Sequence, residues 1–364
     1  MAIENCFMSD CFFETIYKLK QINPKLDEKE LTSNLINYSM LYFRLNYDGK
    51  NYSLDGYEDF LNTIVNYYEL AQKDDVFRNK KWNHSRIGED KNLHHAAYLT
   101  LAKDLLFKNG YTKEDLKNPT TLAEINNLLD EKMWKTEFYY HAFNGGNLDG
   151  IIKNGINPAV TKEYQIEINE INHIFEKHGV TMSFGWQKIN SENKVSYSKT
   201  AAVSYYYGTN SPEWFSQFCG NGFHFMGTPG IDKNAYKNSN YNSAKKNIEL
   251  ICKKLNFSKE ETEKTMAFFE KYWKKYANKQ PMIAVIPQEE LSDSFLEIFE
   301  GNPLDEAIAI CDSLQGVDAQ STTTIDTKNA KFFYMPTEEQ VKEKLKEIDK
   351  KHSKKSTINN ENCK

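Results

Sequence analysis

Apolar residues recur at three- and four-residue steps through the first third of the chain, which is typical of amphipathic helices. One such series is Leu31, Leu35, Tyr38 and Tyr42, and similar patterns run over 57–68 and 96–107. Asp27 followed by Glu30 is typical of a capping box at a helix start. We therefore predict a helical domain over residues 1–133.

Short β-branched and aromatic runs alternate with helical patterns from residue 134 onward, which indicates an α+β domain over 134–336. The predicted strands are Phe138–His141, Val180–Phe184, Val195–Ser198, Gly222–Met226, Met282–Ile286 and Lys331–Met335. A helical insert occupies 240–278, where Ser258 and Glu261 predict a second capping box. The last segment, 337–364, begins as a helix and then becomes poor in apolar residues, which predicts a disordered tail.

Composition narrows the classes of function. The 364 residues are 40% hydrophobic and 13% aromatic, so the chain can bury a large core. Lys and Arg number 46 against 51 Asp and Glu, a balance of −5 that gives no basic surface for nucleic acid. The first ten residues lack the pattern of a secretory signal, and no run is long enough to span a membrane. We expect a cytoplasmic protein, or one secreted without a signal peptide.

Common catalytic and metal-binding motifs do not occur in the sequence. Phosphate-loop, dinucleotide-binding, zinc-protease and serine-hydrolase patterns are missing, and we predict no metal site. The six cysteines form no CxxC pair and are expected to be free thiols. Cys219 with His224 could form a nucleophile and base, but a buried thiol is the favoured interpretation. The neighbouring His94 and His95 are interpreted as structural or surface residues.

The stretch from Phe138 to Pro158 carries the most specific signal. An aromatic run that predicts a strand ends at His141, and a turn with paired glycines follows. A short apolar-periodic helix then closes at Gly155. The stretch therefore predicts the order strand, histidine, turn, helix.

This stretch resembles the first catalytic motif of NAD-dependent ADP-ribosyltransferases of the diphtheria-toxin and poly(ADP-ribose)-polymerase type. The matching residues are Tyr140, His141, Gly146, Leu148, Asp149, Ile151, Lys153, Gly155 and Ile156, with Ala142 where the family has glycine. The resemblance implies a split-sheet fold in which His141 hydrogen-bonds a ribose of NAD. It also implies that the backbone of Ala142 and Phe143 contacts the nicotinamide amide.

The family also has a second element, a strand and a helix whose aromatic rings hold nicotinamide, and two segments are similar to it. The first runs from Val195 to Gly208 and contains Tyr197, Ser198, Tyr205 and Tyr206. The second runs from Gly220 to Tyr236 and contains His224. A tyrosine or histidine face would stack on the cationic nicotinamide ring with a gain of roughly 1–2 kcal/mol. Both segments remain candidates.

The third element of the family is an acidic residue that begins a late strand. Asp318, ahead of the predicted strand Lys331–Met335, is the candidate, and Glu290, Glu306 and Gln320 are alternatives. A carboxylate stabilises the positive charge that develops on the ribose when nicotinamide leaves. The resemblance thus implies catalysis by His141, Tyr197 and Asp318.

The activity that follows from the resemblance is transfer of ADP-ribose from NAD to a protein, with release of nicotinamide. The protein would be a glycosyltransferase with NAD as its substrate, and its composition is compatible with a bacterial effector or toxin. An inactive NAD- or protein-binding module of the same fold is the alternative, and an interaction scaffold without a nucleotide site is a third possibility.

Overall fold

The fold is described from a computed structural model of the chain. The described residues are 3–46, 53–73, 92–93, 96–97, 100–101, 103, 110, 138–157, 162–181, 195–198, 200–210, 213–221, 225, 227–287, 295–297, 319–321 and 323–361.

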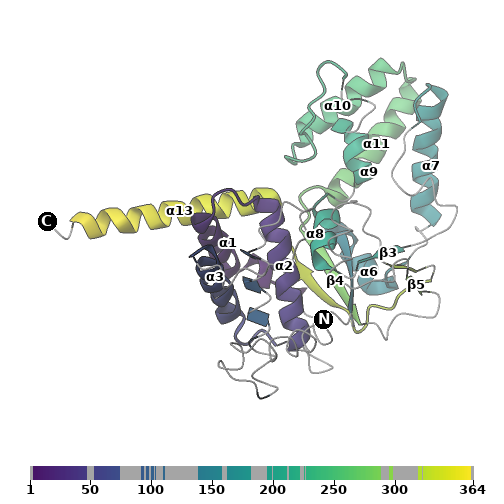
Figure 1. The fold of residues 1–364 in the computed structure, drawn as a ribbon. Coiled ribbons are helices and arrows are strands. Elements are labelled where there is room, and N and C mark those ends of the chain that lie inside the picture. Colours follow the sequence, from purple (N-terminus) through teal and green to yellow (C-terminus); the bar gives the residue numbers. More distant parts are fainter. Residues whose placement is uncertain are drawn as a thin grey trace.

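A four-stranded mixed sheet forms the centre of the molecule (Figure 1). In spatial order its strands are β1 (Ile3–Glu4), β7 (Lys331–Tyr334), β4 (Pro281–Pro287) and β2 (Phe138–Asn144). The pair β1 and β7 is parallel, and the other two pairs are antiparallel. Every residue of β4 is buried, as expected for an apolar run between two strands and between two packed faces. Together with the helices, this sheet gives a mixed arrangement compatible with the predicted α+β class.

A second, three-stranded antiparallel sheet lies beside the first. Its order is β3 (Val195–Tyr197), β6 (Ala319–Ser321) and β5 (Phe295–Glu297). Tyr140 of β2 and Ser198, directly after β3, form a β-bridge between the two sheets. Their backbones exchange hydrogen bonds of 2.8 and 2.9 Å. The outer edge of β2 is therefore where the sheets meet.

The N-terminal helices share one core with a face of the four-stranded sheet. The helices concerned are α1 (Asp10–Ile22), α2 (Glu28–Leu45), α3 (Tyr57–Lys73), α8 (Ala201–Asn210) and α13 (Glu338–Glu361), with the short helix η1 (Cys6–Met8) before α1. Phe138, Tyr140 and Phe333 of the sheet belong to the same buried cluster as Phe7 and Phe43. The predicted boundary at residue 133 therefore does not separate two cores, and β1 also ties the N-terminus into the sheet.

The opposite face of the sheet is covered by a smaller cluster around α6 (Leu148–Asn154), which follows the short helix η4 (Gly145–Asn147). Alternate residues of β2 divide between the faces, so that Tyr139 and Phe143 belong to this second cluster. Gly155 ends α6, as predicted, and Ile156 forms a β-bridge with Ile325. This bridge fixes the start of the segment that leads into β7.

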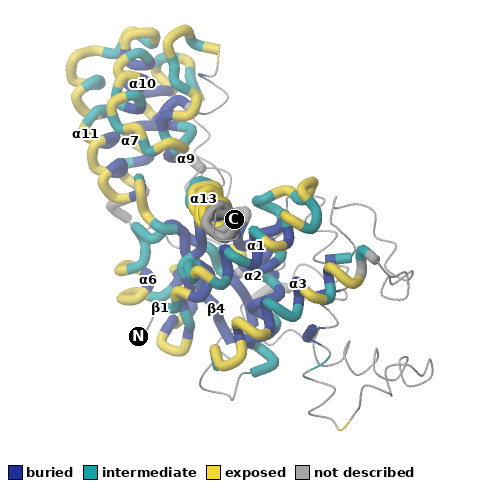
Figure 2. Tube along the Cα trace, turned by 90° about the vertical axis from the view of Figure 1, so that its left-hand side faces the viewer, coloured by how far each residue is buried: buried dark blue, intermediate teal, exposed yellow. Residues whose placement is uncertain are grey.

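The predicted helical insert is part of a larger helical lobe. It consists of α7 (Lys162–Lys177), α9 (Glu213–Ser216), the π-helical turn η6 (Gln217–Asn221), α10 (Tyr241–Lys254) and α11 (Lys259–Tyr276). The capping box between Ser258 and Glu261 is present in both directions, which confirms that prediction. In Figure 2 this lobe has a buried interior and exposed outer turns. It has its own aromatic core, separate from the two cores on the sheet.

Several predicted boundaries differ from the structure. His141 lies in the middle of β2 rather than at its end, because the strand continues to Asn144. Val180 and Thr181 are not in a strand, and Phe225 lies in a turn; the other residues predicted as strands with them are outside the described residues. The C-terminal segment is helical to Glu361, where a disordered tail was predicted. Its end projects beyond α1 in Figure 1.

Replacement of two glycines in the α6 region should change the free energy of unfolding in opposite directions. Gly155 has φ 75° and ψ −179°, a region that other residues rarely adopt, and a Cβ there would collide with the carbonyl oxygen of Ile325. We expect Gly155→Ala to lower the free energy of unfolding by about 1–3 kcal/mol. Gly150 is within α6 and has open space around its Cα. Gly150→Ala should therefore raise the free energy of unfolding by about 0.5–1 kcal/mol. Urea titration measures both; equal effects would contradict this account.

Candidate functional site

His141 lies at the junction of the two sheets. Its Nδ1 is 3.1 Å from the carbonyl oxygen of Ser196 in β3. Its ring lies 5.5 Å from that of Tyr197 and 6.2 Å from that of Phe143, measured between ring centroids. The side chain is half-buried, whereas both aromatic neighbours are buried. The structure therefore brings together the predicted residues His141, Phe143 and Tyr197.

The contact with Ser196 defines the tautomer of His141. A carbonyl oxygen only accepts hydrogen bonds, so Nδ1 must carry the proton and donate it. Burial lowers the pKa of His141 from its ordinary value of 6.5, while the hydrogen bond to Ser196 acts in the opposite direction. At neutral pH the ring is therefore neutral, and Nε2 is an acceptor. Such a ring can accept a hydrogen bond from a hydroxyl group.

Ala142 presents its backbone at the edge of β2. In a strand, the N–H and C=O groups of residues i and i+2 point to the same edge. Tyr140 bonds Ser198 across the outer edge, so the peptide groups of Ala142 point to that edge also. A Cβ at Gly208 of α8 would approach the Cβ of Ala142 to 3.0 Å, so the Ala142 side chain faces α8. The alanine methyl group thus packs away from the face that carries His141.

The side chains of Tyr197 and Ser198 are both buried. The side chain of Tyr197 is only 1% exposed, and burial raises its pKa. It therefore supports the His141 ring, and its own face is not open for stacking. Ser198 is buried, and its Oγ accepts a hydrogen bond of 3.1 Å from the backbone N–H of Thr200. This contact turns the chain from β3 into α8.

Residues of α2 hold the first turn of α8. Asn37 Oδ1 accepts a hydrogen bond of 3.1 Å from the N–H of Ala201. The hydroxyl of Ser33 donates one of 3.1 Å to the carbonyl of Ala202. The helical region predicted as a separate domain therefore positions the helix that begins directly after the site.

Two of the remaining aromatic candidates lie in cores. Tyr205 is fully buried in the cluster on the opposite face of the sheet from His141, so its prediction as a cofactor contact is wrong for this arrangement. The predicted orientation of the Tyr205 side chain was wrong, because a helix turns about 100° per residue and the sequence alone does not determine which face points inward. Phe143 is on the His141 face but packs edge-on against Phe332 at 6.0 Å. The side chain of Tyr206 is outside the described residues.

The second candidate segment does not supply the site in the described structure. Tyr236 packs in the helical lobe, in T-shaped contact with Phe215 at 5.5 Å and Trp273 at 6.0 Å. His224 lies outside the described residues. Cys219 is fully buried in the same lobe, and burial raises its pKa well above the ordinary value, which confirms its interpretation as a buried thiol. The first segment, Val195 to Gly208, is the one that meets His141.

The candidates for the acidic residue lie near or outside β6, the strand that pairs with β3. Asp318, Glu290 and Glu306 lie outside the described residues, and Gln320 is opposite Ser196 in the ladder. Ala319, the residue after Asp318, is opposite Tyr197. This pairing was not predicted: the late strand expected after Asp318 was Lys331–Met335, which forms β7 in the four-stranded sheet, whereas β6 pairs with β3.

Sequence reasoning missed Glu297. In β5 it is opposite Ala319, which is in turn opposite Tyr197, so three register partners run across the second sheet. The available signal was the short run Ser294–Phe299, in which a glutamate interrupts apolar residues. It was too short to be recognised as a strand.

Comparisons with known proteins add no further assignment. No protein-family model matches the chain, and neither curated proteins nor solved structures gave a significant match.

Among the described residues, no cluster of three or more His, Cys, Asp or Glu side chains is arranged to hold a metal ion. None of the described helices has the length and apolar character needed to cross a membrane.

The lowered pKa of the half-buried His141 predicts a pH dependence of stability. The folded state resists protonation of this ring, whereas the unfolded chain binds the proton below the ordinary pKa of 6.5. Stability from this group is present above pH 6.5 and is lost as the pH falls through 6.5 toward the lowered folded value. In His141→Asn the amide can still donate to Ser196 but does not titrate. We expect a smaller loss of unfolding free energy between pH 7.5 and 5 than in the wild type.

Urea titrations at the two pH values measure this difference. Replacement of the exposed His173 by Asn is the matched control and should leave the wild-type difference intact. If His141→Asn and the wild type lose equal stability, the imidazole is not held neutral by the fold.

Proposed function

We propose that the protein transfers ADP-ribose from NAD to a protein acceptor and releases nicotinamide. The observation that carries this proposal is the contact of His141 with Tyr197 and Ser196 where the two sheets meet. Residues 55 positions apart in sequence, His141 and Ser196, are joined there by a hydrogen bond. The motif resemblance requires such a histidine beside such a strand.

His141 positions the substrate in this proposal. With the proton on Nδ1, Nε2 accepts a hydrogen bond from a ribose hydroxyl of NAD. The outward N–H of Ala142 is a donor and its C=O is an acceptor. The carboxamide of nicotinamide offers the complementary acceptor oxygen and donor NH₂ group. Together these groups would fix the ribose and the nicotinamide relative to each other.

The reaction needs an anionic group near the sugar. The bond between ribose C1′ and the nicotinamide nitrogen breaks, and nicotinamide leaves with the electron pair. The acceptor nucleophile then bonds to C1′ and releases its proton. A carboxylate stabilises the positive charge that builds on the ribose. We assign this role to Glu297 because its strand, β5, is joined through β6 to the strand that carries Tyr197; Asp318, which the motif resemblance implies, is the competing carboxylate.

The aromatic contacts divide into two roles in this proposal. The buried Tyr197 supports His141 from the side. Stacking on the nicotinamide ring is assigned to Tyr206 of α8, the helix whose first turn follows Ser198. This assignment is an expectation, since the side chain of Tyr206 is outside the described residues.

The surroundings of the site suit a macromolecular acceptor. The helical lobe and the N-terminal helices extend from the central sheet on different sides (Figure 1). We propose that they contact the protein substrate, and that the protein acts as a bacterial effector or toxin, from the cytoplasm or after secretion without a signal peptide. The acidic overall balance favours a protein over nucleic acid as acceptor.

Nicotinamide release tests the proposal directly. Purified wild-type protein incubated with NAD should release nicotinamide, measured by liquid chromatography, with or without an added acceptor protein. We expect His141→Ala and Glu297→Gln each to lower the rate by on the order of 10²–10³-fold, because each removes one positioned contact to the transition state.

Matched variants separate chemistry from folding. Glu263→Gln replaces an exposed glutamate of α11 and should retain the wild-type rate. If Asp318→Asn abolishes release and Glu297→Gln does not, the carboxylate assignment moves to Asp318. If the wild type binds NAD but releases no nicotinamide, the protein is a binding module; if it neither binds nor cleaves NAD, the proposed function is wrong.

A further inference from the structure

A pocket lies away from His141, on the other side of the four-stranded sheet. It has a volume of ≈370 Å³ and is bounded by the ends of α1, α2 and α13 and by α8. This size is within the range of about 300–1,000 Å³ that is usual for small-molecule sites. Its base is apolar and includes Val341 and the fully buried Tyr205.

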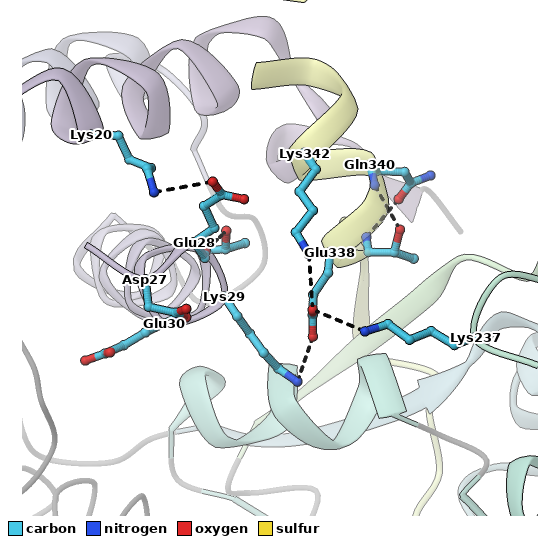
Figure 3. A network of polar contacts seen from close by, with 11 residues as sticks. Lys20, Asp27, Glu28, Lys29, Glu30, Lys237, Glu338, Gln340 and Lys342 are labelled. Atoms are coloured by element: carbon cyan, nitrogen blue, oxygen red, sulfur yellow. Dashed lines mark hydrogen bonds and ion pairs between the residues drawn. The ribbon is translucent and has the colours of Figure 1, made fainter. Parts of the chain in front are cut away.

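Lysines dominate the wall of this pocket. Lys20, Lys25, Lys29 and Lys342 line it, against three carboxylates: Asp27, Glu28 and Glu338. Lys237, from the segment before α10, adds a fifth ammonium group because it reaches Glu338 at 3.8 Å (Figure 3). Among the residues that line the pocket, four lysines thus stand against three carboxylates.

Two of the three carboxylates are committed to local structure. Asp27 is the N-cap of α2, and its side chain accepts a hydrogen bond of 2.9 Å from the N–H of Glu30. Glu28 forms an ion pair of 3.3 Å with Lys20.

Glu338 differs, because it lies at the convergence of several cations. Its carboxylate is 3.0 Å from Lys29, 3.8 Å from Lys237 and 4.0 Å from Lys342. Burial would raise the pKa of Glu338, but the hydrogen bond from Lys29 and the charges of the lysines lower it below its ordinary value. Three ammonium groups from three different segments thus meet on one anionic side chain.

The helix termini add to the positive potential. Glu338 is the first residue of α13, and Glu28 is the first residue of α2. The N-terminal turns of α2 and α13 border the pocket and each contributes a partial positive charge, whereas the C-terminal turn of α1, which carries Lys20, contributes a partial negative charge. Lysine ammonium groups and helix N-termini are both favourable to phosphate oxygens.

We propose that this pocket binds a small organic molecule that carries a diphosphate group, with Glu338 as the internal anion that the ligand displaces. Lys29 and Lys342 transfer from the Glu338 carboxylate to phosphate oxygens, and Lys25 closes over the second phosphate. The organic part of the ligand lies beside Leu26, the partly exposed apolar residue of the lining. The proposal does not depend on the activity proposed for His141.

Inorganic pyrophosphate is the probe for the test, measured by isothermal titration calorimetry on the full chain at low salt. Wild-type protein should bind it, and binding should weaken as the salt concentration rises. Lys29→Gln should weaken binding by on the order of tenfold, because it removes a charge-assisted hydrogen bond. Glu338→Gln should strengthen it at least about fivefold, because it removes a competing negative charge.

Two control variants show whether pyrophosphate binds specifically in this pocket. Lys344→Gln changes the same residue type on α13, but Lys344 pairs with Glu347 and does not line the pocket, so it should bind as the wild type does. His141→Ala should also retain pyrophosphate binding, which separates this pocket from the proposed NAD site. No binding by folded wild-type protein, equal losses in Lys29→Gln and Lys344→Gln, or weaker binding by Glu338→Gln would each overturn the proposal.

Discussion

The backbones of Tyr140 and Ser198 exchange two hydrogen bonds, and the candidate site depends on this bridge between the two sheets. Because the bridge occupies the outer edge of β2 at Tyr140, the next residue, His141, stands beside Ser196 and Tyr197. The peptide groups of Ala142 follow on the same edge as those of Tyr140. This pair of backbone hydrogen bonds thus places His141 beside the carbonyl of Ser196, which determines its tautomer, and beside the ring of Tyr197. It also leaves the N–H and C=O of Ala142 at the same edge of β2.

The N-terminal helices contribute to this arrangement from the opposite face of the sheet. Asn37 and Ser33 of α2 hold the first turn of α8, and α8 begins directly after the strand that carries Tyr197. The same α2 begins at the pocket formed with α13 and α8. The helix α2 therefore contacts both the pocket and the first turn of α8.

The local patterns were predictable from the sequence, and the long-range ones were not. The order of β2, turn and α6 with its closing Gly155, and the capping box of Ser258 and Glu261, follow from neighbouring residues. Which way Tyr205 points depends instead on where α8 meets the sheet. The place of Glu297 depends on a ladder between segments separated by many residues, and β1 has only two residues, too few to give a periodic signal.

The central claim is that His141 is a neutral, Nδ1-protonated ring whose Nε2 receives a ribose hydroxyl of NAD. Nitrogen-15 NMR of the histidine rings measures both parts, with His141→Asn used to assign the signal. We predict the pattern of a neutral Nδ1–H tautomer at pH 7 and a shift of the Nε2 resonance on addition of NAD. A charged ring, the opposite tautomer, or an Nε2 resonance that NAD leaves unchanged would contradict the account.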